Sequence, residues 1–115
     1  MAEPVPKLFS SDCSRPGIVV GRVEGEVDLH NSPSLRGEIN HALKGMKTEK
    51  LVLNLSKVPY MDSSGIAVLV ETLKELRKVG GKLVLTELQP RVRGVLEIAR
   101  LDSIFHIAAD DQAAM

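Results

Sequence analysis

The strongest constraint on the fold is a short apolar run followed by an amphipathic stretch and a second short apolar run. Residues 51–55 are almost all hydrophobic, as in a strand that is central in a sheet or covered on both faces. Apolar residues then recur at helical spacing from Ser64 to Val79, and Gly80-Gly81 is a typical helix stop. Lys82–Thr86 predicts the next strand. A strand, a helix and a strand in this order predict a right-handed crossover and a parallel pair.

Two further helices are predicted, one on each side of this unit. The first starts at Asn31, where Ser32 can cap the helix and Pro33 suits its first position. The last opens at Pro90. The apolar faces are expected at Leu35, Ile39, Ala42, Leu43 and Met46 in the first helix, at Ile66, Leu69, Val70, Leu73 and Leu76 in the second, and at Val92, Val95, Leu96 and Ala99 in the third.

The remaining segments predict short strands and a C-terminal tail. A weak strand at 5–9 and a β-branched strand at 18–25 would form a hairpin around a polar turn, and 104–107 would be the last strand. Asp110 begins a helical turn or a flexible tail. The order β-β-α-β-α-β-α-β predicts an α/β fold, with a single mixed β-sheet of four to five strands and helices packed against it. We expect the whole chain to be one domain, with its core at about 17–107.

Composition excludes several classes of function. Fifteen basic residues balance fifteen acidic ones and aromatic residues make up 3%, which argues against direct binding to nucleic acid or to an anionic membrane surface. The N-terminus lacks the basic and apolar regions of a signal peptide, and no apolar run approaches the length that spans a bilayer. Cys13 is the single cysteine, so a reducing compartment, the cytoplasm, is expected.

The most unusual segment is 59–67, which joins a buried strand to an amphipathic helix and contains Asp62, Ser63, Ser64 and Gly65. In open α/β sheets, ligands and partners bind beyond the carboxyl ends of the strands, where this loop is expected. Either serine can cap the helix, with its hydroxyl exposed at the loop. From the local sequence alone, an ordinary helix cap with a tight turn explains the segment equally well.

Four segments, in order, resemble a known family. Residues 61–66 (Met-Asp-Ser-Ser-Gly-Ile) look like the signature loop of bacterial anti-sigma factor antagonists, which have the STAS fold. Residues 23–28 (Val-Glu-Gly-Glu-Val-Asp) are similar to the family's Gly-Glu-hydrophobic-Asp, residues 80–85 to its Gly-Gly turn into a strand, and residues 96–105 to its ending. Many members have Gly-Leu-Gly after the serines, whereas this chain has Ala67 at the last of these positions. Alanine is a strong helix former, so the expected fold is unchanged.

The resemblance implies a partner-switching cycle. The unphosphorylated protein would bind an anti-sigma factor that is also a serine kinase, and would thereby free the sigma factor. Phosphorylation of Ser63, with Ser64 as the second candidate, would end binding, and a PP2C-type, metal-dependent serine phosphatase would reverse it. The partner-binding residues would be Asp28, Asp62, Ser63, Ser64 and Gly65. The chain itself would need no cofactor and hold no metal, because ATP and magnesium belong to the kinase.

Elementary electrostatics supplies a mechanism for such a switch. A phosphate adds about −1.5 to −2 charges at neutral pH. At a helix N-terminus we expect it to meet free backbone N–H groups and a favourable dipole, so the fold should tolerate it. Asp62, and Asp28 if the two strand ends align, would place like charges beside the phosphate in a partner interface. We therefore expect repulsion at the interface, without unfolding, to end binding.

Three alternatives stay open from the sequence. An enzyme would need Ser63, His30 and Asp28 as nucleophile, base and orienting group, but no Gly-x-Ser-x-Gly segment surrounds the serine, so we predict no enzyme activity. Asp28 and Asp62 have two interpretations: a functional one, in which they shape the kinase-facing surface and orient the serine hydroxyl, and a structural one, in which Asp28 caps the next turn and Asp62 caps the helix. A STAS module of a stress-signalling scaffold or of a membrane transport complex would keep the fold and leave Ser63 unmodified.

Overall fold

The computed structural model describes residues 9–44 and 48–115. In chain order, its elements are β1 (Phe9–Arg15), β2 (Ile18–Glu24), α1 (Ser32–Leu43), β3 (Lys50–Lys57), α2 (Ser63–Lys78), β4 (Lys82–Thr86), α3 (Pro90–Ile98), β5 (His106–Ala108) and α4 (Asp111–Ala114). Strand β1 pairs antiparallel with β2, and β2, β3, β4 and β5 are parallel neighbours in that order. The single mixed sheet predicted from the sequence is confirmed, with five strands.

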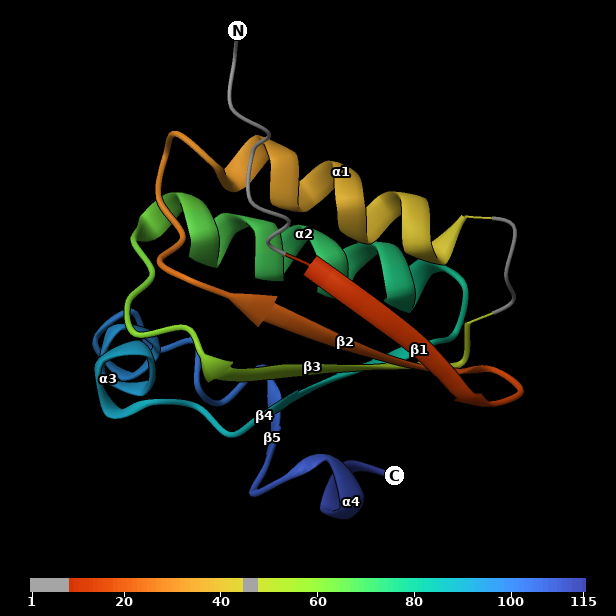
Figure 1. Ribbon diagram of the computed structural model, residues 1–115. Coiled ribbons are helices and arrows are strands. Elements are labelled where there is room, and N and C mark those ends of the chain that lie inside the picture. The colour runs from red at the N-terminus through yellow and green to blue at the C-terminus, as the bar shows by residue number, and fades with distance from the viewer. Residues whose placement is uncertain (1–8, 45–47) are drawn as a thin grey trace, which may run out of the picture.

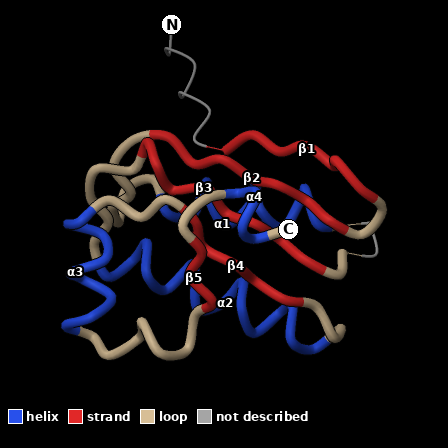
Figure 2. Tube along the Cα trace, turned by 90° about the horizontal axis from the view of Figure 1, so that it is seen from below, coloured by secondary structure: helices blue, strands red, loops and turns tan. Residues whose placement is uncertain are grey.

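Strand β3 is the central strand and separates two unequal apolar clusters. Its leucines belong to the large core, which α1 and α2 cover side by side (Figure 1). On the opposite face, Val52 packs with Val20, Val84 and Ala114 of α4. Figure 2 shows this face, with α4 in front of the strands and α1 and α2 behind them. Helix α3 contributes to the large core and lies toward the end of the sheet at which β2 and β3 finish (Figure 1).

The helix faces follow the predicted periodicity. Eight of the predicted positions are buried: Leu35, Ile39, Ile66, Leu69, Leu73, Leu76, Val92 and Leu96. Four more are partly buried against the same core: Ala42, Leu43, Val70 and Val95. The prediction for Ala99 is wrong, because α3 ends at Ile98 and the exposed Ala99 is already its C-cap. Met46 lies outside the described residues.

The N-terminal hairpin is present, but its first strand lies later in the sequence than predicted. We placed the strand at 5–9 and a polar turn after it. The structure instead has β1 at Phe9–Arg15, and residues 5–8 lie outside the described part of the chain. The turn between β1 and β2 consists of Pro16 and Gly17. Gly17 has a φ of +82°, a conformation that suits glycine after proline in a tight turn. The polar residues of β1 are compatible with a strand because they lie at an exposed sheet edge.

The C-terminal residues are packed against the sheet, where we expected a flexible tail. The last strand, β5, is shorter and later than the predicted 104–107, and Phe105 before it is buried in the large core. The helical turn expected from Asp110 is present, with the Asp110 carboxylate accepting a hydrogen bond from Ala113 N at 2.8 Å. Lys50 Nζ donates to Ala114 O at 2.9 Å and so anchors α4 to β3.

No helix in the described ranges 9–44 and 48–115 has the length and apolar character needed to cross a membrane.

Candidate functional site

The loops that follow β2 and β3 meet at one edge of the sheet, as expected for parallel neighbours. Val27 and Met61 form an isolated parallel bridge. Val27 N donates to Tyr60 O at 3.1 Å, and Asp62 N donates to Val27 O at 3.0 Å. The structure therefore confirms that the two strand ends align, and it brings the loop containing Asp28 beside Asp62.

Asp62 caps α2, so the prediction that Ser63 or Ser64 caps it is wrong. One carboxylate oxygen, Oδ1, accepts hydrogen bonds from Ser64 N at 2.9 Å, from Gly65 N at 3.3 Å and from Ser64 Oγ at 2.5 Å. The other, Oδ2, accepts from Leu29 N at 3.2 Å in the neighbouring loop. The structural interpretation of Asp62 as a helix cap is thus confirmed.

The hydrogen bonds to Asp62 also set its charge state. The Ser64 hydroxyl, followed by the backbone N–H groups of Gly65, Ser64 and Leu29, holds the pKa of the Asp62 carboxyl below its ordinary value of 3.8, against a smaller opposing effect of desolvation. Asp62 is therefore a carboxylate at neutral pH, directly before the two serines.

The two serines differ in what their hydroxyls do. Ser63 is the first residue of α2, its side chain is exposed, and its Oγ makes no hydrogen bond to any residue that the structure describes. Ser64 is half-buried and its Oγ donates to Asp62. We predicted that either hydroxyl would be exposed at the loop, but both serines lie within the helix, and only the hydroxyl of Ser63 is both exposed and uncommitted.

Gly65 lies beneath this surface and lets the two loops approach each other. A Cβ at Gly65 would overlap Met61 Cγ and lie 2.9 Å from Val27 Cγ1, closer than such atoms can approach. The residue is buried, so it sets the spacing between α2 and the bridge of Val27 with Met61. Its position gives a packing reason for the glycine after the two serines.

Asp28 is taken up by its own loop. Its Oδ1 accepts from His30 N at 2.9 Å and from Asn31 N at 3.0 Å, while its own N–H donates to Asn31 Oδ1 at 2.9 Å. Asn31 Nδ2 donates to Glu26 O at 2.8 Å. The structural interpretation of Asp28, that it caps the next turn, is confirmed. The N-cap of α1 is Asn31, which makes no side-chain capping bond, and not Ser32, which is buried as the first helical residue.

Comparison with known proteins identifies the family. A family model described as the STAS domain matches residues 14–114. BtrV of Bordetella bronchiseptica, a proposed anti-sigma factor antagonist, is 37% identical over 99 residues, covering 85% of this chain and 84% of BtrV. The anti-sigma-B factor antagonist of Bacillus subtilis is 32% identical, covering 81% of this chain and 84% of its own. The chain belongs to the STAS domain family, among the anti-sigma factor antagonists.

The fold of this STAS domain agrees with solved structures. The anti-sigma factor antagonist SpoIIAA in its unphosphorylated form superposes with a TM-score of 0.78 at 27% identity, covering 92% of each chain. SpoIIAA from Bacillus in its phosphorylated form gives a TM-score of 0.70 at 26% identity, covering 92% of this chain and 96% of that one. The family resemblance predicted from the four sequence segments is confirmed.

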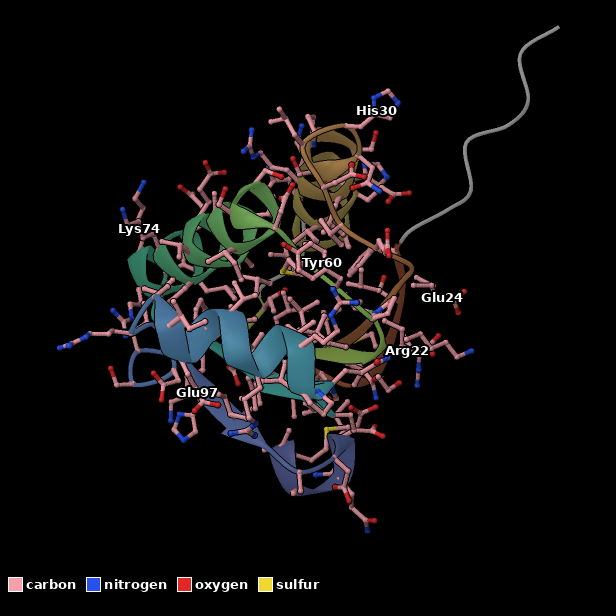
Figure 3. All side chains as sticks on the ribbon, turned by 90° about the vertical axis from the view of Figure 1, so that its left-hand side faces the viewer. Arg22, Glu24, His30, Tyr60, Lys74 and Glu97 are labelled. Carbon is pink, nitrogen blue, oxygen red and sulfur yellow. The ribbon has the colours of Figure 1, made fainter. Side chains whose placement is uncertain are left out.

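The sequence interpretation missed two features of this end of the STAS domain, the exposed Leu29 and the half-buried Tyr60. Leu29, between Asp28 and His30, is 77% exposed. The sequence signal for this exposed side chain is the occurrence of one apolar residue between polar neighbours. The Arg91 guanidinium of α3 lies over the Tyr60 ring, 5.0 Å from the ring centre, in a cation–π contact. Figure 3 views this end of the molecule, with His30 at one side of the surface and Tyr60 near its centre. No sequence signal pairs Tyr60 with α3.

The arrangement needed for the enzyme alternative is not formed. Within the described residues, no hydrogen bond joins the His30 side chain to Ser63 or to Asp28, whose contacts with His30 involve only the backbone N–H. In the same part of the chain, no group of three or more His, Cys, Asp or Glu residues is placed to hold a metal ion.

Proposed function

We propose that this chain is an anti-sigma factor antagonist that binds an anti-sigma factor serine kinase while Ser63 is unphosphorylated, thereby freeing a sigma factor. Phosphorylation of Ser63 ends this binding. The observation that carries the proposal is the exposed and uncommitted hydroxyl of Ser63 at the start of α2, beside an ionised Asp62. The names of the relatives, anti-sigma factor antagonists from several bacteria, support the same function.

Ser63 is favoured over Ser64 as the phosphoacceptor by the geometry of their hydroxyls. A kinase must reach the hydroxyl oxygen and align it with the γ-phosphate of ATP. Ser63 meets this requirement without rearrangement, whereas Ser64 Oγ would first have to leave Asp62 and its half-buried position. Ser64 is therefore a residue of the capping arrangement.

The charges around Ser63 support release by repulsion. We expected a phosphate to find free N–H groups at the helix start, but Asp62 already accepts from the N–H groups of Ser64 and Gly65. A phosphate of about −1.5 to −2 charges would therefore be added next to a carboxylate, with Asp28 on the adjoining loop. Desolvating this combined negative charge in an interface is unfavourable, while the helix dipole still favours an anion within the fold.

The remaining parts of the cycle complete the proposal. A PP2C-type serine phosphatase would restore the binding form, and ATP with magnesium would be supplied by the kinase. The chain would act in the cytoplasm as a binding protein and not as an enzyme, without direct contact with nucleic acid or membrane. SpoIIAA, a structural relative, has been solved in unphosphorylated and phosphorylated forms.

The proposal is tested by capture from lysate of the host cell with wild-type protein, Ser63→Ala and Ser63→Asp as baits. Ser103→Asp, an exposed serine in the turn before β5, is the matched control for the added charge. We expect wild type, Ser63→Ala and Ser103→Asp to retain an ATP-binding anti-sigma factor kinase, identified by mass spectrometry, and Ser63→Asp to lose it. Incubation of the wild type with that kinase and ATP should place one phosphate on the peptide containing Ser63.

Equal recovery of a partner by all four baits would contradict the phospho-switch. If that partner were a component of a stress-signalling scaffold or of a transport complex, the second candidate function would replace the first.

A further inference from the structure

The two carboxylate oxygens of Asp62 bond to two different elements of the surface. Oδ1 accepts from Ser64 N and Gly65 N and so fixes the first turn of α2, which carries Ser63. Oδ2 accepts from Leu29 N, 33 residues earlier in the chain. One side chain therefore bonds both to the helix that would be modified and to the loop before α1.

Leu29 is the apolar side chain that this loop presents to solvent. It is 77% exposed, while its neighbours in the loop are polar. The loop around it is held by the mutual hydrogen bonds of Asp28 and Asn31. An apolar side chain on a backbone that is already ordered can be buried by a partner with little loss of conformational entropy. Leu29 and Ser63 share Asp62 as an anchor, so they belong to one surface.

A phosphate on Ser63 would act on Asp62 in two ways that reinforce each other. Its charge repels the neighbouring carboxylate. Its oxygens are also strong acceptors at a helix N-terminus, so they compete with Asp62 for the N–H groups of Ser64 and Gly65. Both effects favour a rotation of the Asp62 side chain, and its hydrogen bond from Leu29 N is then lost.

We propose that Asp62 transmits the phosphorylation state of Ser63 to Leu29, so that the switch alters the position of an apolar contact residue as well as the local charge. This inference rests on the proposed function of Ser63 as the phosphoacceptor. The change is confined to the segment after Val27, because the backbone bonds that join Val27 to Tyr60 and Asp62 involve no carboxylate. Asp62 is thus a positioning residue for the loop that carries Leu29.

The test uses the isolated chain with phosphoserine installed genetically at position 63, and with phosphoserine at position 103 as the control. NMR measures the solvent exchange and chemical shift of each backbone amide. We expect the Leu29 amide to exchange roughly tenfold faster with phosphoserine at 63, and its proton shift to move upfield as the bond to the carboxylate is lost. The Val27 amide should stay unchanged in both proteins. An unchanged Leu29 amide would overturn the inference.

Asp62→Asn shows whether the effect passes through the carboxylate. Asparagine keeps a capping oxygen but removes the charge and one of the two acceptors. In this background we expect fast Leu29 exchange from the start, and no further change when Ser63 is phosphorylated. An equal acceleration by phosphorylation in both backgrounds would show that Asp62 is bypassed, and would also overturn the inference.

These measurements need no partner protein. The inference can therefore fail while a kinase is still captured by the wild-type chain, and it can hold if no kinase is captured, so the two failures are distinguishable.

Discussion

The two loops at the carboxyl edge of the sheet use the same kind of side chain in different ways. In the loop between β2 and α1, Asp28 and Asn31 bond to each other's backbone, and Asn31 bonds to Glu26 O, so the loop is closed on itself. In the loop between β3 and α2, Asp62 bonds forward to the helix and across to Leu29. The side chains of the first loop fix only that loop's shape, whereas the Asp62 side chain of the second fixes its own helix and the neighbouring loop.

This difference separates residues that shape the surface from residues that contact a partner. Changes at Asp62 or Gly65 should disturb both loops, since these residues lie where the loops join. Changes at Leu29 or Ser63 should leave the fold intact, because both side chains are exposed and point away from the core. The following substitutions test that division, starting with the largest expected effect.

Gly65→Ala should destabilise the protein, whereas Gly37→Ala should stabilise it. The new methyl group at Gly65 overlaps Met61 and Val27, and such overpacking typically costs about 1–3 kcal/mol. Gly37 lies in α1, and a methyl group there would meet no atom within 4 Å, so alanine should add roughly 0.5–1 kcal/mol through helix propensity. Urea unfolding followed by circular dichroism measures both free energies. Equal effects at the two glycines would show that the junction of the loops is not tightly packed.

Leu29→Ser should weaken kinase binding about tenfold, with no loss of thermal stability. The matched control is Ile98→Ser on α3, since Ile98 is 87% exposed but lies outside the two loops. We expect the control to bind within about twofold of wild type, because its side chain belongs to another surface. Titration calorimetry with the captured kinase provides the dissociation constants. A similar loss at both positions would point to a general effect of surface hydrophobicity.

Asp62 should make a small, pH-dependent contribution to stability. Its pKa is lowered in the folded protein, so the folded state binds that proton more weakly than the unfolded state. The contribution is therefore fully present above the ordinary value of 3.8 and is lost as the pH falls through the lower, folded-state pKa. The difference in unfolding free energy between wild type and Asp62→Asn should be constant near neutral pH and shrink below roughly pH 4. A difference that grew on acidification would contradict this assignment.

Much of the fold could be predicted because its signals are local. The apolar run of β3 and the helical spacing in α2 each follow from neighbouring residues. Strand β1 could not be placed because Ser10, Ser11 and Asp12 favour turns by themselves. They form a strand through pairing with Arg22, Gly21 and Val20 of β2, a partner that local propensity does not include.

The candidate site was predicted in position but not in detail. Asp62, Ser63 and Ser64 are all good N-cap residues, so propensity alone could not select among them. Contacts with the neighbouring loop distinguish Asp62, since its N–H donates to Val27 O and its Oδ2 accepts from Leu29 N. The Leu29 N–H donates a hydrogen bond to Asp62, 33 residues later in the chain, and no sequence spacing encodes such a contact.

The anchoring of α4 has a practical consequence for the design of baits. Ala114 fills the apolar strip on the sheet face opposite α1 and α2, and Lys50 Nζ donates to the carbonyls of Ala114 and Met115. An affinity handle fused after Met115 would begin against the sheet and compete with these contacts. A handle placed ahead of residue 1 adds no residue after Met115 and so avoids this competition.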